Sequence, residues 1–127
     1  MNLKTISVDN APKAIGPYAQ GIVAGGFLFT AGQVGLDPAT MKLVEDDVAA
    51  QTRRVFDNLE AVLAGAGATL ADVVRAGAFL VDMGDFAKMN EVFAARFGSH
   101  RPARTTVAVA ALPAGARVEI DLVVRVG

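Results

Sequence analysis

The chain has 127 residues, 12 basic and 13 acidic side chains, and a formal net charge of −1. With this balance and only 6% aromatic residues, it offers no basic, aromatic-rich surface for nucleic acid. The absence of cysteine excludes disulfides, thiolate metal ligands and cysteine nucleophiles, and the single histidine leaves little for a metal site.

An apolar content of 53% and a mean hydropathy of +0.41 are high for one small domain, which indicates apolar surface that is covered in subunit contacts. No 18-residue run lacks charged or turn-forming residues, so we expect no membrane span, and the first residues do not have the pattern of a secretory signal. These observations favour a single domain over residues 1–127 in a cytoplasmic, oligomeric protein.

The first part of the chain is expected to form strands joined by loops and turns. Two prolines and a glycine within residues 10–18 favour an ordered loop over a helix. Gly25-Gly26 is typical of a tight hairpin, and Asp37-Pro38 begins another turn. Strands are therefore predicted at residues 3–8, 19–24 and 27–33.

A first amphipathic helix is predicted from about residue 46 to residue 64. Asp46 or Asp47 can cap its N-terminus, and the glycines at 65 and 67 end it. Its apolar stripe consists of Val48, Val55, Leu59 and Val62, widened by Phe56 and Leu63.

A turn, a strand and a second helix come next. The sequence TLAD at 69–72 resembles a short capped turn. Residues 73–81 are apolar apart from Arg75 and are predicted to form a strand that is buried on both faces. The second helix is predicted from residue 85 to residue 97, with Asp85 as its N-cap.

The last part of the chain contains the clearest alternation of apolar and polar residues. One face would carry Val118, Ile120, Leu122 and Val124, and the other Arg117, Glu119 and Asp121. Residues 105–112 are rich in β-forming and small apolar side chains, and Pro-Ala-Gly-Ala at 113–116 is a turn. We therefore predict a hairpin of two strands.

The order of these elements predicts an α+β or mixed α/β domain in which both helices cover one face of the sheet. The opposite face then has no cover within the chain. We expect it to pack against other subunits.

Arg104 and Glu119 are candidates for the chemistry of a small-molecule site. An arginine at the start of a strand can bind a carboxylate through two parallel hydrogen bonds, and a glutamate fixed on a strand can orient a water molecule. Each also fits a simpler role, as a surface arginine paired with an aspartate and as a solvated glutamate. Tyr18, in a Gly-Pro-Tyr loop, can either hydrogen-bond a ligand or anchor the loop.

The predicted hairpin separates the two charged candidates. In a symmetric tight turn Glu119 pairs with Ala110, so Arg104 lies about six residues, or about 20 Å, further along its strand. One small molecule does not span that distance. The two groups can share a site only across a subunit boundary, or if the two strands are not hairpin neighbours.

Other catalytic arrangements do not fit the sequence. His100 has no second histidine or cysteine with which to hold a metal, and Ser7 and Ser99 do not lie in a nucleophile elbow. Residues 21–26 lack the Lys-Ser/Thr of a phosphate-binding loop.

Several separated motifs, in order, carry a resemblance to a known family. They are NAPKAIGPYAQG (10–21), FTAGQ (29–33), Asp37-Pro38, Phe86, Met89-Asn90, RPARTT (101–106) and VEID (118–121). Over essentially its whole length the chain resembles the RidA/YjgF family of imine and enamine deaminases.

The resemblance implies a chorismate-mutase-like α+β fold with a mixed sheet of about six strands and two helices on one face. It also implies a homotrimer with a central barrel and sites in the clefts between subunits. The implied reaction is the hydrolysis of 2-imino acids, such as 2-iminobutanoate and 2-iminopropanoate, to 2-keto acids and ammonia without metal or cofactor. No nucleic acid or membrane partner is expected.

The resemblance also assigns residues. Arg104 matches the arginine that binds the substrate carboxylate, Glu119 the glutamate that positions water, and Tyr18 the tyrosine of the cleft. The substrate-binding set implied in this way is Arg104, Tyr18, Gly32, Asn90 and Thr106.

Two positions depart from the family pattern. Ala31 replaces a common serine before the Gly-Gln pair, which removes a hydroxyl, and Thr106 stands where cysteine is frequent. A non-catalytic module that binds or senses a 2-keto acid or another small carboxylate is therefore an alternative. An endoribonuclease or translation inhibitor, as reported for some relatives, is disfavoured by the slightly acidic balance of the chain.

Overall fold

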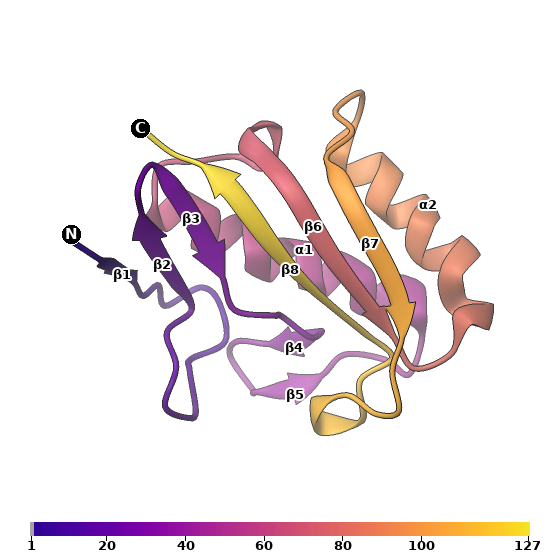
Figure 1. Ribbon diagram of the computed structural model, residues 1–127. Coiled ribbons are helices and arrows are strands. Elements are labelled where there is room, and N and C mark those ends of the chain that lie inside the picture. The colour runs from indigo at the N-terminus through magenta and orange to yellow at the C-terminus, as the bar shows by residue number, and fades with distance from the viewer. Residues whose placement is uncertain (1) are drawn as a thin grey trace.

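The computed structural model describes residues 2–127, in which both helices lie on one face of a six-stranded mixed sheet (Figure 1). Its strands are β1 (Lys4–Ile6), β2 (Gly21–Ala24), β3 (Phe27–Thr30), β6 (Val73–Leu80), β7 (Ala103–Ala108) and β8 (Val118–Arg125). They lie in the order β1-β2-β3-β8-β6-β7, with only β6 and β7 parallel. The predicted two-layer α+β fold is confirmed.

The N-terminal half of the sheet is built from tight turns. Gly25 and Gly26 join β2 to β3 with positive φ angles of 58° and 84°, which glycine adopts at little cost. The turn at Asp37-Pro38 is also present, and its flanks form a small ribbon that the sequence analysis did not predict. The ribbon pairs β4 (Leu36–Asp37) with β5 (Lys42–Leu43).

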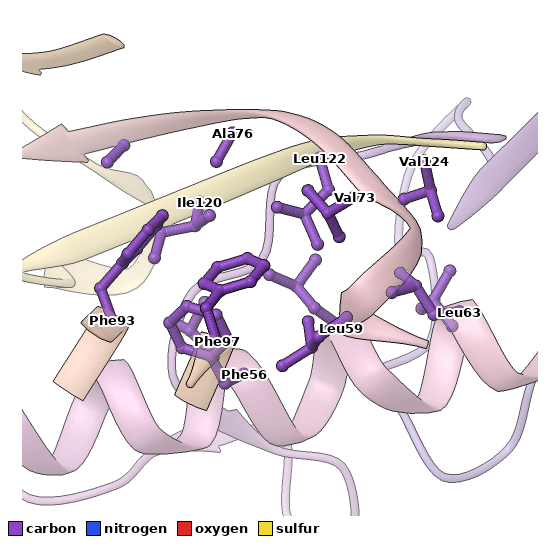
Figure 2. Packing of buried hydrophobic residues seen from close by; sticks show 14 of the residues in the cluster. Phe56, Leu59, Leu63, Val73, Ala76, Phe93, Phe97, Ile120, Leu122 and Val124 are labelled. Carbon is purple, nitrogen blue, oxygen red and sulfur yellow. The ribbon is translucent and has the colours of Figure 1, made fainter. Parts of the chain in front are cut away.

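Helix α1 (Val48–Gly65) supplies most of the helical side of the core (Figure 2). Of the two predicted caps, Asp47 is the N-cap, since its carboxylate accepts a hydrogen bond from the Ala50 amide at 2.8 Å. The helix ends as predicted, with Gly67 at a φ of 73° after it. The fully buried stripe consists of Val55, Phe56, Leu59, Val62 and Leu63.

Helix α2 (Phe86–Phe97) follows a 3₁₀ turn at Met83–Asp85. Asp85 stands at the N-cap position as predicted, but its carboxylate makes no capping bond and accepts from Arg117 Nη1 at 3.3 Å. Asp82 starts the 3₁₀ turn and accepts from the Gly84 amide at 2.8 Å.

The two helices meet through aromatic rings, as Figure 2 shows. Phe93 and Phe97 of α2 each make an edge-to-face contact with Phe56 of α1, with ring centroids 5.6 Å apart. This cluster fixes α2 against α1 beside the β7 edge of the sheet (Figure 1).

Strand β6 occupies the centre of the C-terminal half. The predicted turn before it is a 3₁₀ turn at Leu70–Asp72, in which the Thr69 amide donates to the Asp72 carboxylate at 2.9 Å. Ala76, Ala78 and Leu80 are fully buried under the helices. The prediction that this strand is buried on both faces is wrong for the single chain, since Val74 is 40% exposed.

The predicted C-terminal hairpin is also wrong. Strands β7 and β8 both pair with β6, which lies between them (Figure 1). The β6-α2-β7 unit is a parallel crossover, and the connection after β7, with its 3₁₀ turn at Pro113–Gly115, passes the end of β6. The alternation in β8 identified a strand and its faces correctly, but it contains no information on the neighbouring strand.

The sheet face opposite the helices carries large apolar side chains. Phe27, Phe29 and Val107 are 39%, 44% and 40% exposed on this open face. Among residues 2–127, no helix combines the length and the apolar character that are needed to cross a membrane.

Candidate active site

The two charged candidates lie on opposite faces of the sheet. In β8 the side chains of Val118 and Ile120 are buried against the helices, so Glu119 between them is on the open face. In β7 Arg104 is level with the fully buried Ala76 of the parallel strand β6, which places it on the helix face. Its contact with Asn90 of α2 agrees with this placement.

The register gives the separation between the two residues. Glu119 is level with Phe79 of β6 and not with Ala110, whereas Arg104 is level with Ala76. Their backbones are therefore about 10 Å apart along the strands and about 10 Å apart across them. The hairpin distance was wrong, yet the sheet itself prevents both side chains of one chain from holding the same small molecule.

Glu119 lines a cavity of about 180 Å³ together with Tyr18 and Gly32. The other residues of this cavity are Pro12, Lys13, Ile15, Gln33, Val34, Leu36, Met41, Pro113 and Ala114. The structure thus brings together three of the predicted site residues from three separate segments. Tyr18 is 53% exposed, which leaves its phenol accessible to a ligand.

A bulge next to β8 places Gly32 against Glu119. Between the pairs Phe29–Val123 and Gln33–Ile120, three residues face two, and the Thr30 hydroxyl accepts a hydrogen bond from the Leu122 amide at 2.9 Å. A Cβ atom at position 32 would lie 2.3 Å from Glu119 Oε2. Only glycine leaves room for the carboxylate here.

The environment of Glu119 makes ionisation of its carboxyl group less favourable than in water. Burial raises the pKa of its carboxyl group above the ordinary 4.5, and the negative charge of Asp121 raises the pKa further. No hydrogen bond or ion pair from residues 2–127 reaches this carboxylate. A half-buried carboxylate with free oxygen atoms and a raised pKa is suited to accept a proton from water.

Arg104 lines a separate pocket of about 380 Å³ on the helix face. Its Nη1 donates to Asn90 Oδ1 at 2.7 Å, and its guanidinium carbon lies 4.6 Å from the ring centroid of Phe93. Within the described part of the chain it has no acidic partner. The guanidinium is oriented by these contacts, and its remaining N–H groups can bind an anion.

Thr106 follows on the same face of β7. Its hydroxyl is buried and finds no hydrogen-bond partner among residues 2–127. A buried unpaired hydroxyl is unusual in a folded protein. Thr106 itself is not among the residues that line the Arg104 pocket. The predicted set is thus divided into a Glu119 half-site (Tyr18, Gly32, Glu119) and an Arg104 half-site (Asn90, Arg104, Thr106).

Two buried amides that support the Glu119 half-site were missed by the sequence analysis. Gln20 accepts from the Val8 amide at 2.7 Å and donates to the Pro12 carbonyl at 2.9 Å, which fixes the loop that carries Tyr18. Asn58 of α1 donates to the Leu36 carbonyl at 2.9 Å and so holds the cavity wall. The only signal for Asn58 was a polar residue on the apolar side of a predicted helix.

His100 has a structural contact, since its Nε2 lies 2.7 Å from the Val73 carbonyl oxygen. From Asn2 to Gly127, no three histidine or acidic side chains come close enough together to hold a metal ion.

Comparison with known proteins identifies the family. Residues 8–126 match the family model described as Endoribonuclease L-PSP. Protein DfrA of Myxococcus xanthus is 53% identical over 125 residues, which cover 97% of this chain and 95% of that protein. The 2-iminobutanoate/2-iminopropanoate deaminase of Escherichia coli K12 is 42% identical over 123 residues, covering 94% and 95%.

A solved structure agrees with these matches. The crystal structure of RidA from an Antarctic Psychrobacter has a TM-score of 0.93 and 44% identity, covering 97% of this chain and 99% of that one. These likenesses confirm the resemblance seen in the sequence motifs. The chain therefore belongs to the endoribonuclease L-PSP family, the family of the RidA proteins.

Proposed function

We propose that the protein hydrolyses reactive 2-imino acids to 2-keto acids and ammonia, in a site that combines the two half-sites from two copies of the chain. The observation that carries this proposal is the division of complementary groups between opposite faces of the sheet. An oriented, unpaired arginine lies on one face, and a carboxylate of raised pKa lies in a cavity on the other.

The chemistry needs few protein groups. An imine protonated on nitrogen is already electrophilic, so the site must hold the substrate carboxylate, position a water molecule and transfer protons. Arg104 binds the carboxylate in two parallel hydrogen bonds, an interaction worth about 1.5–3 kcal/mol per charge-assisted bond. Asn90 keeps the guanidinium in place.

Glu119 of a second copy acts as general base. It takes a proton from water as the water oxygen bonds to the imine carbon, which gives a tetrahedral carbinolamine. The carboxylic acid then returns the proton to the nitrogen. As the C–N bond breaks and ammonia leaves, Glu119 takes the proton of the hydroxyl group, so that the carbonyl of the keto acid forms and the proton passes to solvent. Tyr18, in the same cavity, donates a hydrogen bond to the bound substrate.

The open face of the sheet is where we propose that copies meet. Phe27, Phe29 and Val107 are exposed there, and their burial against other copies removes apolar surface from water. We propose a homotrimer with the sheets around a central barrel, as the family resemblance implies. Light scattering in solution should then give the mass of three chains of 13.1 kDa each.

The proposed substrates are 2-iminobutanoate and 2-iminopropanoate. They are supported by the name of the Escherichia coli relative at 42% identity. Ala31 lies next to Gly32 at the cavity, and its missing hydroxyl favours a second candidate function, the binding of a 2-keto acid without catalysis.

The decisive experiment measures keto acid and ammonia release from 2-iminobutanoate that is generated in situ by a dehydratase. Wild type should accelerate release, and Glu119→Ala should return the rate to that of spontaneous hydrolysis, a loss of about 10²–10⁴-fold for a general base. If folded wild type binds 2-oxobutanoate but gives no acceleration, the binding module is the correct function.

A further inference from the structure

The pocket on the helix face contains a second guanidinium. Arg101, in the segment just before β7, lines the same 380 Å³ pocket as Arg104. The other residues of the pocket are Asn90, Phe93, Ala94 and Pro102, so no acidic side chain lines it. Two guanidinium groups therefore line one pocket.

Neither arginine is neutralised by the protein. All the ion pairs within residues 2–127 are made by three different arginines, Arg54, Arg96 and Arg117. Like charges in one pocket repel each other, and a bound anion removes this repulsion. One arginine is enough for one carboxylate, because the guanidinium binds both carboxylate oxygens. The second arginine exceeds what a monocarboxylate requires.

Arg101 also has a structural contact that must be separated from ligand binding. Its Nη1 donates to the carbonyl of His100 at 2.9 Å and to the carbonyl of Gly98, at the C-terminal end of α2. Cations are favourable there because the helix dipole is negative at this end. These bonds involve a single nitrogen, and they hold the guanidinium at the pocket while its other two nitrogens keep their N–H donors.

We infer that this pocket selects dicarboxylates. Arg104 binds the carboxylate next to the imine carbon, and Arg101 binds the carboxylate at the end of the side chain. Within the proposed imine hydrolysis, the preferred substrates are then the 2-imino dicarboxylic acids, the imines of aspartate and glutamate, with Arg101 as the residue that determines specificity. The monocarboxylates 2-iminobutanoate and 2-iminopropanoate are then the weaker substrates. The role of Arg104 in this inference rests on the proposed function, whereas the preference for two negative charges is a property of the pocket alone.

The test compares two keto acids, 2-oxoglutarate and 2-oxobutanoate, by titration calorimetry on the full-length protein. Arg101→Gln removes the charge and keeps an N–H donor for the carbonyls of Gly98 and His100. Wild type should bind 2-oxoglutarate about tenfold or more tightly than 2-oxobutanoate, as a further charge-assisted contact provides. Arg101→Gln should abolish that preference and change the binding of 2-oxobutanoate by less than about twofold.

Arg53→Gln is the matched control, since Arg53 is exposed on α1 and lines none of this pocket. It should leave both affinities unchanged. Equal affinity of wild type for the two keto acids overturns the inference, and so does an equal loss of both in Arg101→Gln, which would show that Arg101 only supports the fold of the pocket.

Turnover separates this inference from the proposed function. Imines of glutamate and alanine, generated by an amino-acid oxidase, should give a kcat/KM ratio that favours the dicarboxylate and falls in Arg101→Gln. Hydrolysis of both imines without that preference overturns only the inference. Selective binding without any hydrolysis overturns only the deaminase function.

Discussion

The carboxyl group of Glu119 is held where its charge is unfavourable, and its activity should depend on pH for that reason. Burial is the main cause of its raised pKa, and Asp121, two residues further along the same face of β8, is the second. In its proposed role as general base, Glu119 must be ionised. The acid limb of kcat/KM should therefore lie above pH 4.5, the ordinary pKa of the group, with activity increasing as the pH rises.

Asp121→Asn should move that limb to lower pH, because it removes the nearby negative charge while its amide oxygen still accepts from the Gly77 amide. The limb should remain above pH 4.5, since burial is unchanged. A pH profile of kcat/KM measures this. Asp9→Asn, at an exposed position of the N-terminal loop, is the control and should leave the profile in place. An unmoved limb in Asp121→Asn would show that the limb does not report on Glu119.

Gly32→Ala tests how closely the backbone must approach the carboxylate. The added Cβ would lie 2.3 Å from Glu119 Oε2, the flexible end of a side chain, so the carboxylate should move while the fold remains. A displacement of about 1 Å at a reacting group can cost about 10²-fold in rate. We therefore expect a large loss of kcat with little change in thermal stability.

Gly67→Ala is the control, and we expect it to change stability and not activity. Gly67 has a φ of 73°, and no atom outside its own neighbourhood lies within 4 Å of the place that a Cβ would occupy. Alanine there should lower the free energy of unfolding by about 1 kcal/mol, because of the strained φ alone, without changing kcat. Loss of stability in Gly32→Ala equal to that in Gly67→Ala would contradict a local effect on Glu119.

At the scale of elements, Gln20 connects β1 and β2 to the loop that carries Tyr18. It is 4% exposed, and its side-chain amide bonds backbone groups of Val8 and Pro12. Gln20→Leu leaves these groups unsatisfied, at a cost of about 1–3 kcal/mol for each buried group. Both the melting temperature and kcat/KM should fall, because the loop loses its fixed position.

Tyr18→Phe distinguishes the contribution of the phenol hydroxyl from that of the loop position. It removes one hydroxyl from an exposed side chain, so the melting temperature should stay near that of wild type. The value of kcat/KM should fall, because the substrate loses the hydrogen bond that the phenol is proposed to donate. Differential scanning calorimetry and imine hydrolysis measure the two properties. A stable, fully active Gln20→Leu protein would show that the loop does not depend on Gln20.

Local patterns predicted most elements, and long-range contacts account for what they missed. The turn at Gly25-Gly26 follows from two adjacent residues, and the face of Glu119 follows from alternation within β8. The neighbours of β8 depend on where β6 inserts, which no local pattern specifies. The partners of Gln20 are backbone groups 8 and 12 residues away, and any side chain can present a backbone group.

The candidate site also could be predicted only in part, because local patterns do not specify long-range contacts. Arg104 and Glu119 became candidates from their places on predicted strands, the family motifs then assigned their roles, and the alternation around Glu119 gave its face. Residues 105–112 have no comparable alternation, so the face of Arg104 required the structure. The predicted distance between Arg104 and Glu119 was wrong because the hairpin on which it was based is absent. The need for a second copy remains a prediction, which now rests on the positions of the two residues on opposite faces of the sheet.

At the scale of the whole molecule, the division into two half-sites predicts that two inactive variants can restore activity together. Arg104→Gln removes the charge of one half-site and keeps a donor for Asn90, and Glu119→Ala removes the base of the other. Each alone should be inactive. In mixed oligomers of the proposed trimer, the intact Arg104 of one copy can meet the intact Glu119 of another.

Coexpression with different tags and purification on both would isolate these mixed oligomers. In a head-to-tail ring of three copies that contains both variants, about a third of the sites have both halves intact. Mixed oligomers of Glu119→Ala and Tyr18→Ala are the control. Both lesions lie in the same half-site, so no site is complete and the activity should not exceed that of the Tyr18→Ala protein alone. Recovery in the first mixture and none in the second would establish a site shared between copies, because a site within one chain gives no recovery in either.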